Sequence, residues 1–121
     1  MRILDSNLII YSALPEYAYL RALIKDPESC ISGISKVEVV GFHRLDSQSK
    51  RYFESVFFCL HTLTISDSII ETAIALRQKR KLSLGDAIIA ATAIEYDYEL
   101  YTRNTADFSA FPQIKIVNPI V

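Results

Sequence analysis

Apolar and polar residues along this chain form short segments of two alternating kinds. Five short apolar segments are typical of β-strands, and they lie at residues 2–4, 29–32, 62–65, 99–102 and 114–117. Longer stretches with apolar residues at helical spacing lie between them, at residues 6–14, 16–25, 35–45, 47–60, 67–81 and 83–96. In the stretch from residue 67, for example, Ile69, Ala73 and Leu76 fall on one helical face. The pattern predicts strands and helices in alternation.

Local signals support these boundaries and the fold class. Ser6, Ser35, Asp67 and Ser83 are predicted helix N-caps, and Pro15 ends the first helix. Because strands alternate with helices, we expect an α/β fold with a mainly parallel, roughly five-stranded sheet. The chain has no repeat, low-complexity tract or linker, so we expect residues 1–121 to form one domain.

Four acidic residues follow the strands of the predicted sheet. Asp5 comes directly after the first strand, and Asp107 follows the fourth. Glu38 and Asp86 are each predicted on the first turn of a helix. Because parallel strands place their carboxyl ends at one edge of a sheet, we expect these side chains to share a cleft.

Carboxylates gathered in one cleft need a cation. They would repel and raise one another's pKa values unless a positive charge lay among them. Oxygen ligands without His or Cys favour a hard cation, Mg²⁺ or Mn²⁺. A cation held in this way can activate water and stabilise a pentavalent phosphate, so the pattern indicates metal-dependent phosphoryl chemistry.

Each acid also has a purely structural interpretation. Asp5 could cap the following helix, and Asp107 could cap a short turn before Phe108. Glu38 could complete a capping box with Ser35, and Asp86 could do so with Ser83. The joint placement of the four acids, and the apolar helix around Asp86, favour the functional interpretation.

Composition and charge further limit the classes of function that this chain can have. The chain has 121 residues, of which 50% are hydrophobic, so a core can form without disulfides. A net charge of −1 gives no global attraction to nucleic acid, and any such binding must be local. A mean hydropathy of +0.20 predicts that a partner or a second copy covers some apolar surface. The glycines form no dinucleotide-binding or P-loop pattern.

For the cysteines, histidines and aromatic residues, the sequence favours a structural role over a functional one. Cys30 and Cys59 are predicted to be reduced core thiols of a cytosolic protein. His43 and His61 have no ligand-like spacing and are expected at the surface or in loops. Four aromatic residues could stack on bases, but core or dimer contact is the default expectation: Tyr17, Tyr19, Tyr52 and Phe53. We expect no signal peptide and no transmembrane segment.

Several motifs together resemble a known family. The stretches "ILDSNLIIY", "SKVEV", "LSLGDAIIAATA", "LYTRNTADF" and "IKIVNP" resemble the PIN-domain ribonucleases, specifically the VapC-type toxins of VapBC toxin–antitoxin modules. The resemblance extends over residues 2–119, and "GDAIIAATA" followed by "TRNTADF" is its most specific part. It implies a three-layer α/β/α sandwich around the sheet.

The resemblance also implies roles for individual residues. Asp5, Glu38, Asp86 and Asp107 match the family's catalytic, metal-binding acidic quartet, and Asp5 and Asp86 match its most consistent metal ligands. Three polar residues match supporting positions: Thr102, Asn104 and Ser6, the last where threonine is common. No acid of the quartet is missing.

The implied activity is that of a Mg²⁺-dependent endoribonuclease, with Mn²⁺ as an alternative ion. It would act in the cytoplasm as the toxin of a type II toxin–antitoxin system and cleave transfer or ribosomal RNA with metal-activated water. The implied partners are RNA, a cognate VapB-type antitoxin and a second copy of the chain, without a membrane.

Basic residues near the acids are candidates for holding the RNA backbone. Lys79, Arg80 and Lys81 precede Asp86, and Arg103 lies between the fourth predicted strand and Asp107. The alternative for the first three is an ordinary helix C-terminus, which favours cations.

Two other classes of function remain open at this stage. A receiver-like signalling module would need adjacent acids after the first strand, but Asp5 is followed by Ser6 and Asn7. A metal-dependent small-molecule phosphohydrolase would share the acid cluster but would need a second acid at position 7.

Overall fold

The chain forms one five-stranded sheet with every neighbouring pair of strands parallel. The computed structural model describes residues 1–121, and the strand order is β3-β2-β1-β4-β5. The strands are β1 (Arg2–Leu4), β2 (Ser29–Ser32), β3 (His61–Leu63), β4 (Glu99–Tyr101) and β5 (Ile116–Val117). The predicted α/β class and parallel sheet are confirmed.

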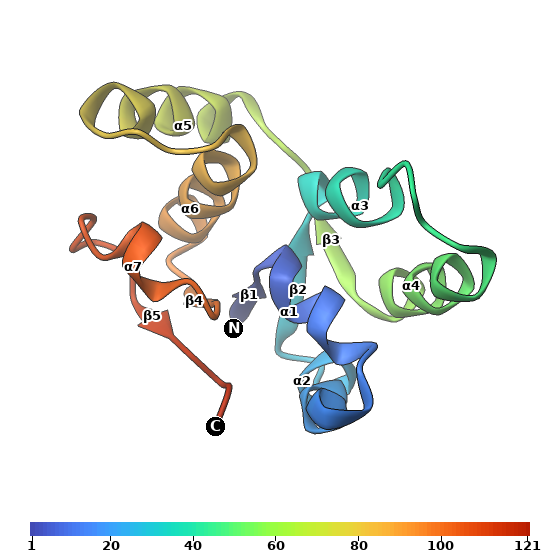
Figure 1. Ribbon diagram of the computed structural model, residues 1–121. Coiled ribbons are helices and arrows are strands. Elements are labelled where there is room, and N and C mark those ends of the chain that lie inside the picture. Colours follow the sequence, from blue (N-terminus) through green and yellow to red (C-terminus); the bar gives the residue numbers. More distant parts are fainter.

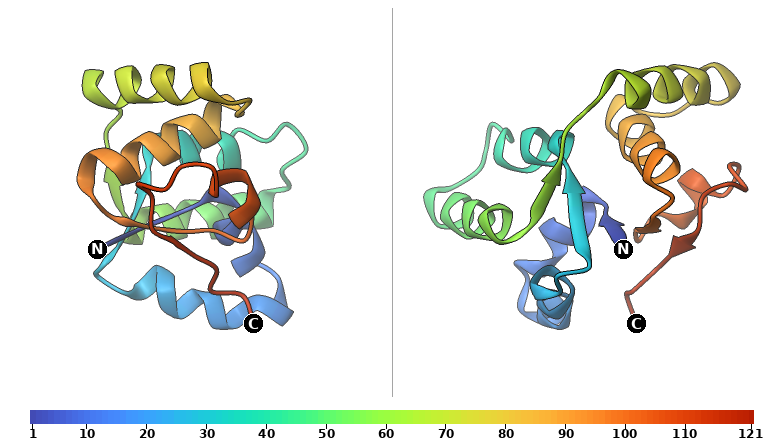
Figure 2. Two further views of the ribbon diagram at one scale, coloured as in Figure 1. Left: turned by 90° about the vertical axis from the view of Figure 1, so that its left-hand side faces the viewer. Right: turned by 180° about the vertical axis from the view of Figure 1, so that it is seen from behind.

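Helices cover both faces of this sheet (Figures 1 and 2). One face carries α1 (Ser6–Ser12), the 3₁₀ helix η1 (Pro15–Leu20), α2 (Arg21–Lys25), α3 (Gly33–Val40) and α4 (Ser47–Cys59). The other face carries α5 (Asp67–Lys79), α6 (Leu84–Tyr96) and α7 (Thr105–Phe108). This arrangement is the three-layer sandwich that the family resemblance implies.

The two hydrophobic cores follow from the two-residue period of the strands. Ile3 packs in the core beneath α5 and α6, whereas Leu4 packs in the core beneath α1 and α4. Cys30 and Ile31 divide in the same way on β2. Since successive side chains of a strand point to opposite faces, strands of two to four residues are enough to build both cores.

Helix α6 lies directly against the sheet. Ala87, Ala90 and Ala91 have no solvent exposure, and small side chains allow the helix axis to approach the strands closely. The rigid packing of this helix fixes the position of its first turn, which carries Asp86.

The strand order places a crevice at the carboxyl ends of β1 and β4. The chain moves outward from β1 to β2 and β3, and then crosses to the other side of β1 to form β4 and β5. The helices after β1 and after β4 therefore lie on opposite faces, and their starts diverge at this point. In open parallel sheets, ligands bind at such a switch point.

Several predicted boundaries differ from the structure. Ser83 caps α6 as predicted, but Asp5, Ser32 and Ser66 hold the cap positions that were assigned to Ser6, Ser35 and Asp67. The side chains of Ser32 and Ser66 accept the capping hydrogen bonds from Ile34 N–H and Ile69 N–H. The helices start earlier because each follows its strand almost directly.

Other differences concern the ends and the kind of the helices. The predicted helix at 16–25 is a 3₁₀ helix followed by a short α-helix, and α7 had been expected only as a turn. Helix α3 ends at Val40, so residues 42–45 are not helical. Cys30 is buried as expected, but Cys59 is exposed, because it lies on the outer side of the last turn of α4. The histidines His43 and His61 are exposed, as predicted.

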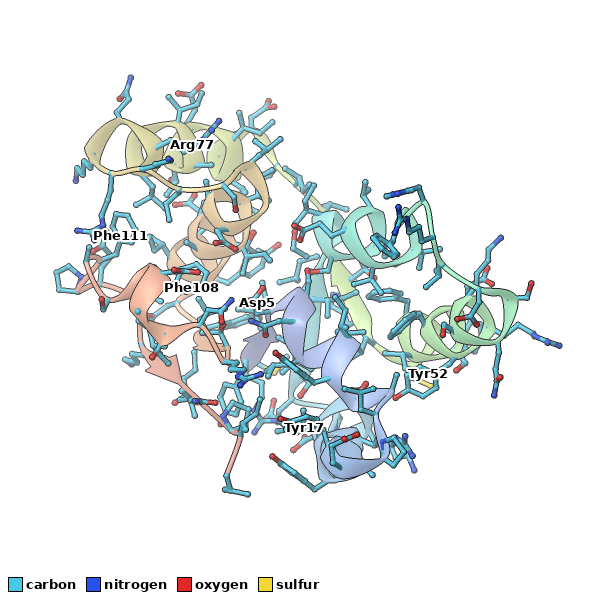
Figure 3. The ribbon with its side chains drawn as sticks, viewed as in Figure 1. Asp5, Tyr17, Tyr52, Arg77, Phe108 and Phe111 are labelled. Carbon is cyan, nitrogen blue, oxygen red and sulfur yellow. The ribbon has the colours of Figure 1, made fainter.

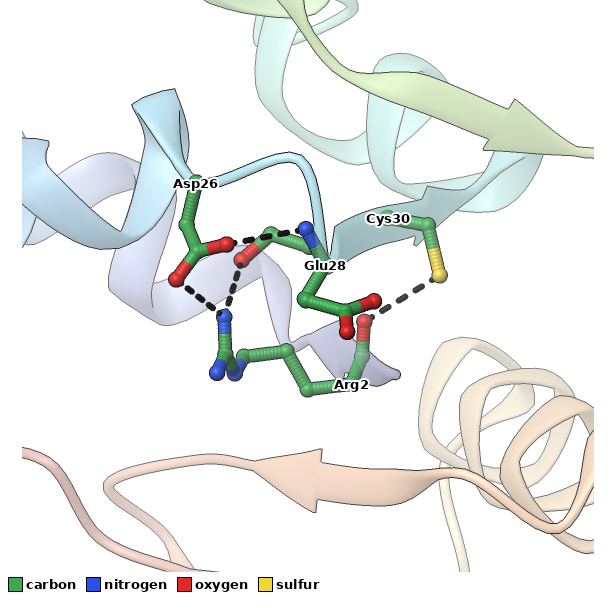
Figure 4. Close-up of polar contacts among 5 residues, drawn as sticks. Arg2, Asp26, Glu28 and Cys30 are labelled. Carbon is green, nitrogen blue, oxygen red and sulfur yellow. Dashed lines mark hydrogen bonds and ion pairs between the residues drawn. The ribbon is translucent and has the colours of Figure 1, made fainter.

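A polar network fastens the amino end of β1 (Figure 4). The Arg2 guanidinium lies 3.0 Å from a carboxylate oxygen of Asp26 and donates a hydrogen bond of 3.2 Å to Ser29 Oγ. It also lies over the ring of Tyr101, 5.2 Å from the centroid. Asp26 in turn accepts a hydrogen bond from Glu28 N–H. This network joins β1 to β2 and β4 at the edge of the sheet opposite the crevice.

Each helix is too short or too polar to span a lipid bilayer.

Candidate active site

Asp5 lies at the switch point, directly after the carboxyl end of β1 (Figure 3). Only 5% of the residue is exposed. Thr102 Oγ1 donates a hydrogen bond of 2.7 Å to Asp5 Oδ2, and Asn104 N–H donates to Thr102 Oγ1 at 3.0 Å. Thr102 has no solvent exposure, so this chain of hydrogen bonds fixes the orientation of the carboxylate across the β1–β4 switch point.

Glu38 reaches the crevice from α3, on the second turn of the helix and not on the first as predicted. The difference follows from the earlier start of α3 at Gly33. Ser6 Oγ lies 2.8 Å from Glu38 Oε1 and 2.9 Å from Ser35 Oγ. Because a hydroxyl carries one proton, Ser6 donates it to the carboxylate and accepts that of Ser35.

Asp86 and Asp107 come from the other face of the sheet. Asp86 lies on the first turn of α6, and Asp107 lies on α7. Both line a pocket of about 290 Å³ together with Arg80, Lys81 and Ser83. Glu38 lines a different hollow of about 410 Å³ between α1 and α3.

The carboxylates lie close enough to alter one another's ionisation. Burial, more than any other cause, raises the pKa of Asp5 to about 6, and the charges of Asp86 and Glu38 add to the effect. The hydrogen bond from Thr102 opposes this rise. Burial also raises the pKa of Asp86, with Asp107 as the next cause and Glu38 as a smaller one. Burial and the neighbouring carboxylates therefore disfavour the charged forms of Asp5 and Asp86, and neither carboxylate takes part in an ion pair.

The donor set suits a hard divalent cation. No three Asp, Glu, His or Cys side chains are grouped closely enough to chelate one ion by themselves. Mg²⁺ keeps several of its waters and is commonly held through one or two carboxylates plus substrate phosphate. Asp5 and Asp86, with Glu38 and Asp107 around them, fit that kind of site.

The structural interpretations of these acids find little support in the contacts. Asp5 occupies the N-cap position of α1, but its side chain makes no capping hydrogen bond. Glu38 cannot form the capping box with Ser35, because Ser32 caps α3. The interpretation of Asp86 is supported in part. Asp86 N–H donates to Ser83 Oγ at 3.1 Å, and a side-chain hydrogen bond with Ser83 lowers the pKa of Asp86, although Asp86 also lines the pocket.

The basic run before α6 divides into two parts. Lys79 lies in the last turn of α5, where cations are favoured by the helix terminus. Arg80 is already extended, with φ −157° and ψ 152°, and both Arg80 and Lys81 line the pocket of Asp86 and Asp107. Neither side chain forms an ion pair, because the one salt bridge of the chain joins Arg2 to Asp26. These two cations are placed to meet an anionic ligand.

Arg103 has a different environment. Its guanidinium donates to the Tyr11 hydroxyl and lies over the Tyr11 ring, 4.8 Å from the centroid. The side chain is exposed beside the crevice and does not line the pocket of Asp86.

Comparison with known proteins decides the family. The PIN domain family model matches residues 2–113. The chain belongs to the PIN-domain family. The resemblance inferred from the motifs is thereby confirmed.

Individual relatives place this PIN domain more closely. It is 29% identical over 93 residues to a ribonuclease VapC of Rickettsia bellii (strain RML369-C), a match that covers 65% of this chain and just under two thirds, 66%, of that protein. It is 32% identical to a chain of a toxin–antitoxin complex from Klebsiella pneumoniae, with a TM-score of 0.81 over 99% of this chain and 98% of that one.

A further solved structure shares the fold. VapBC2 from Rickettsia felis, bound to a DNA fragment from its promoter, has a TM-score of 0.80 with 22% identity and covers 97% of each chain.

Three residues around the acids of this PIN domain make contacts that the sequence did not predict. Ser35 was assigned to a cap but is fully buried against Ser6. Asn7 donates to Thr102 Oγ1 at 3.4 Å, and its buried Oδ1 atom has no hydrogen-bond partner. Gly85 leaves space for Glu38, since a Cβ at that position would lie 2.3 Å from Glu38 Oε2. Only the position of Gly85 next to Asp86 could have drawn attention to it.

Proposed function

We propose that this chain is a Mg²⁺-dependent endoribonuclease and the toxin of a type II toxin–antitoxin system. The observation that carries the proposal is the set of four carboxylates from opposite faces of the sheet at one switch point, with raised pKa values for Asp5 and Asp86. The family and the named relatives support the same activity.

The acids would hold the ion. Asp5 and Asp86 are the ligands best fixed by their surroundings, through Thr102 and through the packed helix α6. A bound Mg²⁺ supplies positive charge for the scissile phosphate and lowers the pKa of a water that attacks it. Mn²⁺, which also prefers oxygen ligands, would serve as a substitute.

Glu38 and Asp107 are placed for proton transfer or for further ion contacts. Glu38 Oε1 accepts the proton of Ser6, whereas Oε2 has no hydrogen-bond partner within the protein. Oε2 is therefore the atom that can accept a proton from the attacking water. In-line attack by water leaves a 3′-hydroxyl on one RNA fragment and a 5′-phosphate on the other.

Arg80 and Lys81 would hold the RNA backbone beside the acids. The pocket of about 290 Å³ is lined both by the carboxylates of Asp86 and Asp107 and by these two cations. A phosphodiester with a bound cation carries both complementary charges, so it fits such a pocket. Arg103, which is exposed and contacts Tyr11, offers a further contact for the RNA backbone.

The partners proposed for the chain follow from the same family. A cognate VapB-type antitoxin would neutralise it, since similar solved structures include toxin–antitoxin complexes. We also propose a homodimer in the cytoplasm. Exposed apolar side chains such as Ile70 and Ile74, one turn apart on α5, provide surface for a second copy. Light scattering after size exclusion tests this, and a monomer at micromolar concentration would contradict it.

The activity is tested on purified protein and structured RNA with Mg²⁺, with Mn²⁺ and with EDTA. We expect cleavage with either metal and none with EDTA, and we expect Asp5→Asn and Asp86→Asn to lower the rate at least about 100-fold. Asp97→Asn is the matched control. Asp97 is an exposed, left-handed residue (φ 55°) between α6 and β4, and asparagine tolerates that conformation.

The alternative functions give different results in the same experiment. Hydrolysis of small phosphomonoesters without cleavage of any RNA would favour a small-molecule phosphohydrolase. Metal-dependent uptake of phosphate onto an aspartate, without RNA cleavage, would favour a receiver-like module. Growth inhibition on expression, relieved by Asp5→Asn but not by Asp97→Asn, would support the toxin role.

A further inference from the structure

A second pocket adjoins the candidate active site between the end of α5 and the loop after α7. Its volume is about 370 Å³, and it is lined by Lys79, Arg80, Ala110, Phe111, Pro112 and Gln113. Arg80 also lines the pocket of Asp86 and Asp107. The two pockets therefore share Arg80 as a lining residue.

The second pocket carries cations without partners. Lys79 and Arg80 are exposed, and neither is part of an ion pair. An unpaired ammonium and a guanidinium on one wall favour a phosphate group, which an arginine can bind through two parallel hydrogen bonds.

The opposite wall offers a different kind of contact. Phe111 is buried with 4% exposure and packs in the core that includes Leu76 and Leu82, so it anchors the loop to α5. Pro112 and Gln113 follow it and are exposed at the pocket. The proline ring gives a rigid apolar surface, and the Gln113 carboxamide can both donate to and accept from the edge of a base.

This combination matches one nucleotide of single-stranded RNA better than it matches an acidic peptide. A nucleotide carries a phosphate for the cations and a flat, hydrogen-bonding base for Pro112 and Gln113, whereas an acidic side chain supplies only the charge. Because Arg80 joins the two pockets, a strand with its scissile phosphate at Asp86 would place its next nucleotide here.

We propose that the second pocket is a nucleotide subsite, in which Lys79 and Arg80 bind a backbone phosphate and Pro112 and Gln113 contact the base next to the cleavage site. The subsite rests on the proposed ribonuclease function and adds to it a source of substrate selectivity. Arg80 serves both pockets, whereas Lys79 and Gln113 serve only the second one.

The test measures the affinity of the full-length chain for fluorescein-labelled decauridine, decaadenosine and decacytidine by fluorescence anisotropy. Ca²⁺ replaces Mg²⁺ so that the oxygen ligands are occupied while the RNA stays intact. For Lys79→Gln we expect affinity at 0.1 M salt to fall about fivefold for all three probes, with the salt slope reduced by about 0.7. For Gln113→Ala we expect the differences between the three probes to shrink, with no change of slope.

Lys50→Gln is the matched control, because Lys50 is an exposed lysine on α4 outside this pocket. Wild-type cleavage of RNA together with unchanged affinities and preferences of Lys79→Gln and Gln113→Ala would overturn the subsite alone. A wild type that neither cleaves nor binds RNA would overturn the proposed function and the subsite with it. Equal loss of affinity in Lys50→Gln would show nonspecific charge attraction and would also overturn the subsite.

Discussion

The two ends of β1 carry charged residues in opposite circumstances. At the amino end, Arg2 is matched by Asp26 at 3.0 Å, and the carboxylate also accepts the Glu28 N–H. At the carboxyl end, Asp5 lies among other acids, and no cation of the protein pairs with it. We call the amino end of β1 the structural edge, because its charged residues pair with each other. We call the carboxyl end the functional edge, because Asp5 there has no cationic partner within the protein.

The contrast appears in the pKa values of the two aspartates. Hydrogen bonding from Glu28 and then from Arg2 holds the pKa of Asp26 below its usual range. Burial raises the pKa of Asp5 to about 6. When an aspartate has a higher pKa in the folded state than in the unfolded state, its ionisation lowers the free energy of unfolding. Without a bound cation, the ionised Asp5 therefore destabilises the folded protein.

Asp5→Asn should give the largest effect, and it should act in opposite directions on activity and stability. The unfolded pKa is near 3.8 and the folded pKa about 6, so the wild type gains stability as pH falls from 7.5 through 6 toward 4. The variant, which retains an acceptor for Thr102, should lack that gain and be more stable at pH 7.5 by about 2 kcal/mol. Its cleavage activity should be lost.

Thermal unfolding at several pH values checks this prediction. Addition of Mg²⁺ should raise the Tm of the wild type and not that of Asp5→Asn, because binding to the folded state alone stabilises it. A variant less stable than the wild type at pH 7.5 would contradict the view that Asp5 is an uncompensated charge.

Thr102→Val should have the second largest effect, a decrease in kcat/KM of about 10- to 100-fold. The substitution removes the hydroxyl that orients Asp5 and leaves the side-chain volume nearly unchanged. The pH–rate profile should shift to higher pH, since this hydrogen bond lowers the pKa of Asp5. Thr102→Ser retains the hydroxyl and should recover most of the activity. An unchanged pH profile in Thr102→Val would show that the hydroxyl only supports packing.

Gly85→Ala should lower kcat/KM about 10-fold with little change in stability. The new Cβ would lie 2.3 Å from Glu38 Oε2, so the carboxylate must move, but it is the mobile end of an exposed side chain. Alanine also favours a helix over glycine. Gly33→Ala is the control, because its Cβ would meet only Leu63 O at 3.7 Å. Equal kinetics of the two variants would contradict a role for the Glu38 position.

Asp26→Asn at the structural edge should have the smallest effect. Asp26 has a lowered pKa, so its stabilising contribution is present above pH 4 and is lost as pH falls below that range. We expect a small decrease of Tm at neutral pH, no further decrease on acidification from this group, and unchanged RNA cleavage. Reduced cleavage would show that the two edges are coupled through β1.

The alternation of strands and helices was enough to predict the sheet and the shared edge of the acids. Apolar positions at periods of two and of nearly four residues report burial directly, and the carboxyl ends of parallel strands coincide whatever the details of packing. The prediction of Asp5 and Asp86 at one edge therefore needed no knowledge of individual contacts.

Side-chain partners far apart in sequence could not be predicted from the residues alone. The hydrogen bond between Thr102 and Asp5 joins residues 97 positions apart, and Thr102 was singled out only through the family resemblance. The pairing of Arg2 with Asp26 was missed entirely, because neither residue has a distinctive sequence pattern. Helix starts were misplaced by one to three residues, since several serines compete for each cap.

The central position of β1 also affects when the acidic crevice can exist during synthesis. β1 leaves the ribosome first, but its neighbour β4 and the helices that carry Asp86 and Asp107 belong to the last third of the chain. A nascent polypeptide that ends before residue 86 contains Asp5 and Glu38 without Asp86 and Asp107. The proposed ribonuclease site can therefore form only after most of the chain has been synthesised, and a product truncated before residue 86 lacks two of its four acids.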